Sequence, residues 1–301
     1  MTVKLFDRSW WQNDNSESQT QAAWVHRYRL WVAFYGNRPA IFGLVLIGLV
    51  LLGAIFAPWL ATHDPVAQNL GQRLLPPSTG NWLGTDELGR DVYSRLLYGG
   101  RVTLGMVLAV VVLVAPVGLL IGCAAGYYRG AADVVLMRVT DVFLAFPRLI
   151  LALAFVAAIH PGMTSAVIAI ALTTWPPYAR LARAETMAIR DTDYIAAARM
   201  TGASSFRIII HHVMPLCFSS LIVRVTLDMS SIVIFAASLG FLGMGAQPPM
   251  AEWGTMISSA RRFILEQWWV PLIPGLAILT VSLAFNLVGD GLRDALDSRQ
   301  N

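Results

Sequence analysis

Lysine is almost absent from this sequence. Lys4 is the only lysine among 22 basic residues in a chain of 301. A phosphate-binding GxxxxGK[ST] loop requires a lysine, and so do kinase-type and Schiff-base sites. None of these sites can be built in the rest of the chain. We therefore expect a protein that does not itself bind or hydrolyse ATP.

Other catalytic and metal-binding patterns are missing as well. The sequence has no HExxH motif, no GxSxG elbow, and no paired-carboxylate, Ser/Lys or zinc arrangement for an intramembrane enzyme. His211 and His212 are adjacent, so on a helix they would point about 100° apart rather than toward one metal ion. Cys123 and Cys217 both lie in or beside apolar runs and indicate no disulfide framework. We expect no catalytic residue, cofactor or metal in this chain.

Charge is scarce: 13% of the residues are charged, against about 25% in soluble domains, and 56% are hydrophobic. Residues 40–61 and 102–126 carry no charge, and about 20 apolar residues suffice to span a bilayer as a helix. The net charge of +4 is spread along the flanks of such runs, without an aromatic and basic recognition element. The sequence thus predicts an all-α integral membrane protein, and no nucleic-acid partner.

Apolar runs and polar breaks divide the chain into two regions. Residues 1–39 form an amino-terminal segment, whose mixed tryptophan and basic residues suit a helix in the headgroup layer. Residues 40–301 form the transmembrane domain. We expect six spans in it, at about 40–61, 102–126, 142–159, 163–179, 216–237 and 270–288, with a short turn at 127–141.

The distribution of Lys and Arg predicts the orientation. With the amino terminus inside, the inner segments contain 14 of these residues and the outer segments 6. Because short cytoplasmic loops are enriched in Lys and Arg, both termini are expected in the cytoplasm. Residues 180–215 then lie in the cytoplasm, whereas 62–101 and 239–269 lie outside.

Three charged residues fall inside the expected spans, where charges are costly and often functional. Arg224 and Asp228 are four residues apart and can pair on one helix face. Either they form a neutralised structural pair, or they lie on a translocation path where a zwitterionic solute meets a positive and a negative side chain. Arg148 follows Pro147 and has no local partner. We expect its side chain to snorkel toward the cytoplasmic surface.

The cytoplasmic segment 180–215 is longer than a hairpin between neighbouring spans requires. Gly202 can end a first helix, and Ser204 or Ser205 can cap a second helix that runs toward Pro215. Two helices around a glycine turn make a rigid projection that could dock in a groove of another protein. A pair of helices on the membrane surface, without a partner, would have the same pattern.

This segment resembles the loop of bacterial ABC-importer permeases written EAA, three residues, G, nine residues, I, any residue, LP. Ala196, His212 and Met214 replace the Glu, Ile and Leu of that pattern. Residues 84–101, 239–256 and 285–297 resemble the second permease subunit of the dipeptide, oligopeptide and nickel group. The segments 57–65 and 73–78 further resemble permeases for D-alanyl-D-alanine dipeptides. The positions that match the loop pattern are Ala197, Ala198, Gly202 and Pro215.

The resemblance implies a type I ABC importer permease in the bacterial inner membrane. It implies a homologous second permease, two cytoplasmic ATPases that bind ATP and Mg, and an external solute-binding protein. The solute would be a dipeptide or short oligopeptide, with nickel, glutathione or another small solute as alternatives. A stand-alone channel or scaffold is the rival class. The residues expected to dock on an ATPase are Ala197, Ala198, Gly202, Ala203, Ser204, Phe206 and Pro215.

The missing glutamate at Ala196 removes the charged contact or cap that the family pattern has at this position. Asp191, Asp193 or Arg199 could replace it electrostatically. Arg224 and Asp228 are the candidates for the translocation pathway.

Overall fold

The computed structural model describes residue 28 and residues 31–297, and within them the chain is helical apart from turns and one isolated bridge between Thr85 and Asp91. The expectation of an all-α protein is therefore confirmed. Most of the predicted interfacial helix, with Trp10, Trp11 and Trp24, lies outside the described residues, while residues 31–36 are helical.

Eleven helices are described between Arg38 and Asp297. Shorter turns of 3-10 type occur at Leu70–Gln72 and Arg261–Phe263, and a π turn occurs at Ile209–Val213. The helices are α3 (Arg38–Ile55), α4 (Ala57–Leu60), α5 (Val92–Tyr128), α6 (Gly130–Ala145), α7 (Arg148–Ile159), α8 (Met163–Ile189), α9 (Asp193–Met200), α10 (Ser205–Ile208), α11 (Met214–Phe241), α12 (Trp253–Ala260) and α13 (Trp269–Asp297).

Side-chain caps begin the first two long helices. The Asn37 side chain accepts a hydrogen bond from the amide of Ala40 at 3.1 Å, at the start of α3. The Asp91 carboxylate accepts one from the amide of Ser94 at 2.8 Å, at the start of α5. Such caps satisfy amides that have no partner within the helix. With its cap at Asp91, α5 begins at Val92, which is ten residues before the start of the uncharged run, 102–126, that predicted this helix.

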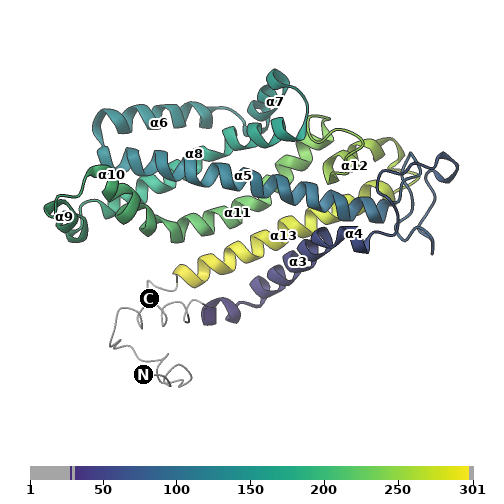
Figure 1. The fold of residues 1–301 in the computed structure, drawn as a ribbon, viewed down its shortest axis with the longest axis horizontal. Coiled ribbons are helices and arrows are strands. Elements are labelled where there is room, and N and C mark those ends of the chain that lie inside the picture. The colour runs from purple at the N-terminus through teal and green to yellow at the C-terminus, as the bar shows by residue number, and fades with distance from the viewer. Residues whose placement is uncertain (1–27, 29–30, 298–301) are drawn as a thin grey trace.

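The closest helix packing in the bundle joins α5 to α8. Gly118, Gly122 and Gly126 recur every four residues on the face of α5 that meets α8, and a Cβ atom at Gly126 would lie 2.8 Å from the Arg183 carbonyl oxygen. Small residues at this spacing let two helix backbones approach closely within a membrane. On the other side of the bundle α13 packs between α3 and α11 (Figure 1).

Among the described residues, four helical segments are long and apolar enough to cross a membrane, and a fifth candidate is a bent pair. The four are Arg38–Ile55, Val92–Tyr128, Ser205–Phe241 and Trp269–Leu296. Helix α8 does not belong to this set, although it has 27 residues. Its polar and proline residues lower its hydropathy, and several of them, including Thr173, Thr174 and Pro176, are buried in the bundle.

The bent pair corrects two predictions. Residues 127–141, expected as a short turn, belong mostly to helix α6. Residues 142–159, expected as one span, are divided between α6 and α7, which meet at 93°. The break falls at Phe146, which is extended with φ −98° and ψ 144°. Pro147 explains it, because proline disfavours a helical conformation in the residue before it.

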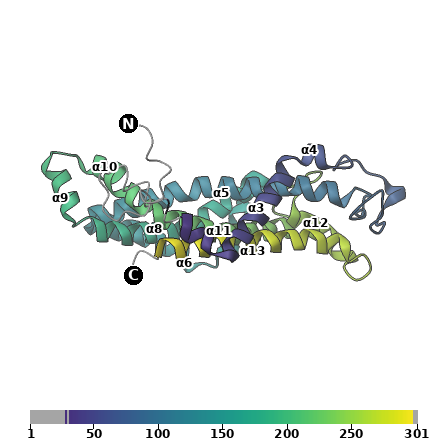
Figure 2. The same ribbon diagram turned by 90° about the horizontal axis from the view of Figure 1, so that it is seen from below.

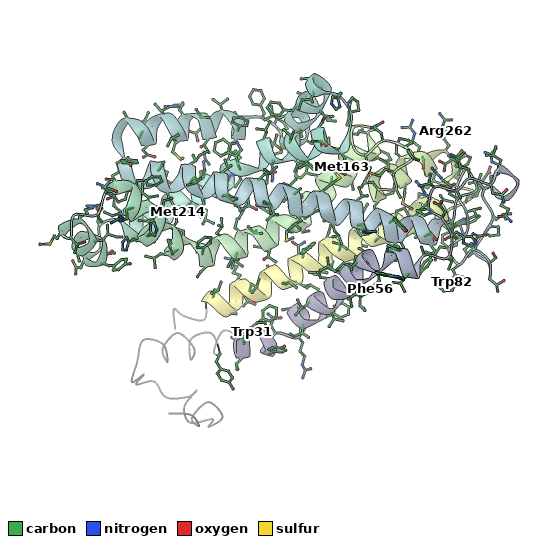
Figure 3. All side chains as sticks on the ribbon, viewed as in Figure 1. Trp31, Phe56, Trp82, Met163, Met214 and Arg262 are labelled. Carbon is green, nitrogen blue, oxygen red and sulfur yellow. The ribbon has the colours of Figure 1, made fainter. Side chains whose placement is uncertain are left out.

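The bundle is elongated, and its two ends differ. Helices α9 and α10 lie at one end, whereas α12 and the segment between α4 and α5 lie at the opposite end (Figures 1 and 2). The beginning of α3 and the end of α13 point toward the α9 and α10 end. Figure 3 places Met214 near this end, and Trp82 and Arg262 at the other.

Candidate functional site

A tight turn joins α9 to α10. Gly202 has a φ of +80°, its amide donates to the Arg199 carbonyl at 3.0 Å, and the Ala203 amide donates to the Ala198 carbonyl at 3.3 Å. These two bonds form a Schellman motif, in which a left-handed residue ends a helix. No atom lies within 4 Å of a Cβ built on Gly202. The conformation, and not lack of space, therefore requires glycine there.

The second helix begins at a serine cap and continues into α11. Ser204, one of the two predicted caps, accepts a hydrogen bond from the Arg207 amide at 3.4 Å. A π turn at Ile209–Val213 then leads directly into α11. Pro215 does not end the second helix, because it lies in the first turn of α11, where proline is tolerated. We call residues 193–213 the α9–α10 projection.

The α9–α10 projection has an anchored face and a presented face. Met200 is 89% exposed and Phe206 is 71% exposed, and Ala196 and Ala197 are also exposed. Large apolar side chains exposed to this extent are available for contact with another protein. Sequence reasoning named Phe206 but missed Met200. The anchored face consists of buried aliphatic side chains, from Ile195, Ile208, Ile209 and Val213.

Polar contacts join the parts of the α9–α10 projection to each other and to the bundle. The Tyr194 hydroxyl lies 2.7 Å from Nδ1 of His212, so this histidine serves a contact between α9 and the π turn. The Arg199 Nε donates to the Tyr127 hydroxyl at 3.2 Å, and its guanidinium lies over the same ring. Among the described residues no three His, Cys, Asp or Glu side chains gather as a metal site, and His211 is exposed.

Ion pairs tie the same end together. Asp191, one proposed substitute for the missing glutamate, pairs with Arg129 at 2.7 Å. Asp133 on α6 receives two hydrogen bonds from Arg183 on α8, at 2.5 and 2.6 Å. Asp141 on α6 also pairs with Arg180 on α8, so both carboxylates of α6 are matched by arginines of the neighbouring helix.

The charged residues within the expected spans lie in one cluster. Arg224 and Asp228 pair through Nε and Oδ2 at 2.9 Å, and Asp228 is buried while the Arg224 side chain is 38% exposed. The spacing therefore predicted their contact correctly. Arg148, whose side chain was expected to snorkel, donates from Nη2 to the Thr174 hydroxyl of α8 at 3.0 Å.

Aromatic residues from α8 and α11 surround these arginines. The Arg148 guanidinium lies 4.9 Å from the centre of the Phe235 ring, and that of Arg224 lies 6.0 Å from the centre of the Tyr178 ring. Tyr178 is fully buried. Sequence reasoning missed Thr174, Tyr178 and Phe235, since uncharged residues in a helix give no signal of a charged neighbour on another helix.

At the opposite end a buried carboxylate holds α12 to α5. Glu252 is fully buried and accepts hydrogen bonds from the amides of Gly254 at 2.8 Å and Thr255 at 2.9 Å, and from the Thr103 hydroxyl at 3.3 Å. Burial raises the pKa of the Glu252 carboxyl, and these donors oppose the shift. The indole of Trp253 adds a bond to the Leu96 carbonyl at 3.0 Å.

Comparison with known proteins gives consistent matches along the chain. Residues 118–301 match the family described as "Binding-protein-dependent transport system inner membrane component". Residues 28–77 match the "N-terminal TM domain of oligopeptide transport permease C".

Individual relatives cover most of the chain. The probable D,D-dipeptide transport system permease of Escherichia coli strain K12 is 45% identical over 264 residues, which is 88% of this chain and 89% of the relative. The dipeptide permease of the same strain is 46% identical over 275 residues, with 89% and 92% covered. The di/tripeptide permease of Pseudomonas aeruginosa strain UCBPP-PA14 is 46% identical over 278 residues, with 89% and 91% covered.

The fold is also similar to that of a solved transporter. A chain of the inward-facing MetNI methionine ABC transporter superposes with a TM-score of 0.54 at 19% identity. The match covers 67% of this chain and 96% of that one. At this identity the likeness concerns the fold alone.

Proposed function

Because this chain belongs to the family of inner membrane components of binding-protein-dependent transport systems, as a permease of the C type, we propose that it forms half of a path for dipeptides or short oligopeptides. The observation that supports a peptide as the substrate is sequence identity. Over most of its length the chain is 45 to 46% identical to three permeases named for di- or tripeptides. The D,D-dipeptide and dipeptide relatives are equally similar, so the proposal covers dipeptides of either stereochemistry. Nickel and glutathione are the alternative solutes.

The proposed topology has six spans with both termini in the cytoplasm. Its spans are α3, α5, the bent pair α6 and α7, α8, α11 and α13. A helix of 27 residues, like α8, is about 40 Å long, which is enough to cross a hydrocarbon core. The arrangement in Figure 1 supports this topology, since α9 and α10 lie at the end toward which the start of α3 and the end of α13 point.

In the proposed complex this permease binds a homologous second permease, two cytoplasmic ATPases that bind ATP and Mg, and an external binding protein. The α9–α10 projection docks on one ATPase through Met200, Phe206 and the turn at Gly202. The helical segment Ser205–Phe241 runs without a break from the projection into the bundle. A displacement of the projection by the ATPase would therefore move α11, which carries Arg224 and Asp228.

Arg224 and Asp228 are proposed to face the translocation path. The partial exposure of Arg224 supports this placement, because a purely structural pair would be expected to bury both side chains. A zwitterionic peptide would meet both signs of charge there.

Purification in mild detergent tests the proposal against a stand-alone channel or scaffold. The tagged chain is expressed with its neighbouring transport genes, and we expect a second permease and ATPase subunits to copurify in fixed proportion. The complex in proteoliposomes should accumulate radiolabelled alanyl-alanine only with ATP and the binding protein. A chain that purifies alone under all mild conditions would contradict the proposal.

A further inference from the structure

The cluster around Arg224 has an excess of positive charge. It contains two guanidinium groups, from Arg148 and Arg224, and one carboxylate, from Asp228, which pairs with Arg224 at 2.9 Å. None of the ion pairs formed by the described residues includes Arg148. Its polar contact is the neutral hydroxyl of Thr174. The cluster therefore carries about one unit of uncompensated positive charge among apolar helices.

A buried donor in the same cluster lacks an acceptor. The Nε of Arg148 is buried and makes no hydrogen bond with a described residue. The Tyr178 hydroxyl interacts with the Asp228 carboxylate, and Arg148 and Arg224 lie within electrostatic range of it. A buried donor without a partner is costly, so an acceptor that reached Arg148 would be favoured.

The position of Arg148 at the start of α7 adds to this preference. The 93° bend separates α7 from α6, and α7 begins at Arg148 without a side-chain cap on its first amides. Figure 1 shows α7 standing across the direction of α6. The amino-terminal end of a broken helix within a membrane carries a partial positive charge and favours anionic groups.

The cluster is also partly exposed at the surface of this chain. Tyr178 and Asp228 are buried, whereas Arg148 is half-buried and the Arg224 side chain is 38% exposed. The guanidinium groups thus lie between a buried floor and the surface of the chain, where a solute or another subunit could reach them.

We propose that Arg148, with Tyr178 and the Arg224–Asp228 pair, forms a recognition site for the carboxylate of the transported peptide. The inference rests on the proposed function. Arg148 donates to the carboxylate, while Asp228 stays paired with Arg224 and next to the Tyr178 hydroxyl, and the negative charge of the peptide balances the excess positive charge. A solute without a carboxylate leaves Arg148 unpaired, and the site therefore discriminates by charge. A carboxylate side chain of the second permease is the competing source of the same chemistry.

The test uses the complete importer in proteoliposomes. Uptake of radiolabelled alanyl-alanine and of alanyl-alaninamide is measured with the binding protein loaded to equal occupancy, together with ATP hydrolysis and subunit copurification. The variants are R148Q, which removes the charge, R148K, which keeps it, and R180Q as a control. Arg180 lies on α8 and pairs with Asp141 in an exposed position outside the cluster.

We expect wild type to transport the acid about tenfold faster than the amide, and R148Q to abolish this preference by slowing the acid alone. R148K should restore most of the preference, and R180Q should leave it unchanged. Equal rates for acid and amide in wild type would overturn the inference. So would an R148Q variant that retains the preference, or that loses uptake of both peptides together with copurification, because the last result assigns Arg148 to the subunit interface. Failure of wild type to transport any peptide would instead refute the proposed function.

Discussion

The amide of Ala203 donates to the carbonyl of Ala198 at 3.3 Å, and this bond closes the turn that reverses the chain between α9 and α10. Both alanines are partly buried against the core, so the turn is fastened by packing as well as by hydrogen bonds. Gly202 sits between them at φ +80°. The direction in which α10 leaves the turn, and the position of Phe206, thus depend on one left-handed residue.

Substitution of Gly202 tests this dependence. In the left-handed region G202V should cost more than about 1–2 kcal/mol, since its side chain is β-branched, whereas G202N should be tolerated. We expect G202V to lower peptide uptake and ATPase copurification at least tenfold, while the chain still reaches the membrane. G243V is the matched control, because Gly243 has φ +78° with open space around it, at the end of α11 away from the projection. Equal loss of ATPase copurification in both valine variants would contradict the docking role of the turn.

The exposed apolar residues of the α9–α10 projection give a second prediction. Met200 and Phe206 contribute little to folding because they are largely exposed, so M200D and F206D should leave the thermal stability of the isolated chain unchanged. If they contact an ATPase, a buried charge there should reduce copurification and stimulated ATP hydrolysis about tenfold or more. L265D at the opposite end, where Leu265 is 94% exposed, should not change either measurement. Normal assembly of F206D with the ATPases would exclude Phe206 from the contact.

Substitution of a glycine on the face of α5 that meets α8 should lower the stability of the chain. An added Cβ at Gly122 would meet the Cβ of Ala182 and the backbone of α8, so G122A should destabilise the chain by about 1–3 kcal/mol. Gly105 on the same helix has no atom within 4 Å of its Cβ position, and G105A should be neutral or stabilising by up to about 1 kcal/mol. Thermal unfolding of both purified variants in detergent measures the difference. Equal unfolding midpoints of G122A and G105A would show that the close approach of α5 and α8 does not contribute to stability.

The sequence predicted those features that depend on neighbouring residues. The glycine turn, the Ser204 cap and the Arg224–Asp228 pair follow from local spacing, and the structure contains all three. Helix α6 was missed because its polar residues suggested a turn. One of its charges, Asp133, is matched by Arg183 of α8, fifty residues away, and the sequence gives no sign of this pairing. The contact of Arg148 with Thr174 was missed for the same reason.

Replacement of both Arg224 and Asp228 tests their role in the pathway. Because the pair has no net charge, R224Q/D228N keeps the charge balance and similar side-chain size, so assembly should be unaffected. If the pair faces the path, peptide uptake should fall about tenfold, or the preference among dipeptides should change, at normal ATP hydrolysis. Uptake and specificity like those of wild type would assign the pair to structure alone. D228N alone should fold worse than the double variant, since it leaves the guanidinium groups of Arg148 and Arg224 together without a carboxylate.

Glu252 predicts a pH dependence of stability at the end of the bundle opposite α9 and α10. Burial raises the pKa of its carboxyl in the folded protein above the ordinary 4.5, so the folded state binds more protons than the unfolded state between the two values. The stability that this protonation contributes is complete below pH 4.5 and is lost as the pH rises through the folded pKa. E252Q does not titrate, so the unfolding free energy of wild type minus that of E252Q should decrease as the pH rises from 4.5. Thermal unfolding in detergent across this range measures the difference, with Glu266→Gln, at an exposed position, as control. A constant difference would show that the raised pKa is absent.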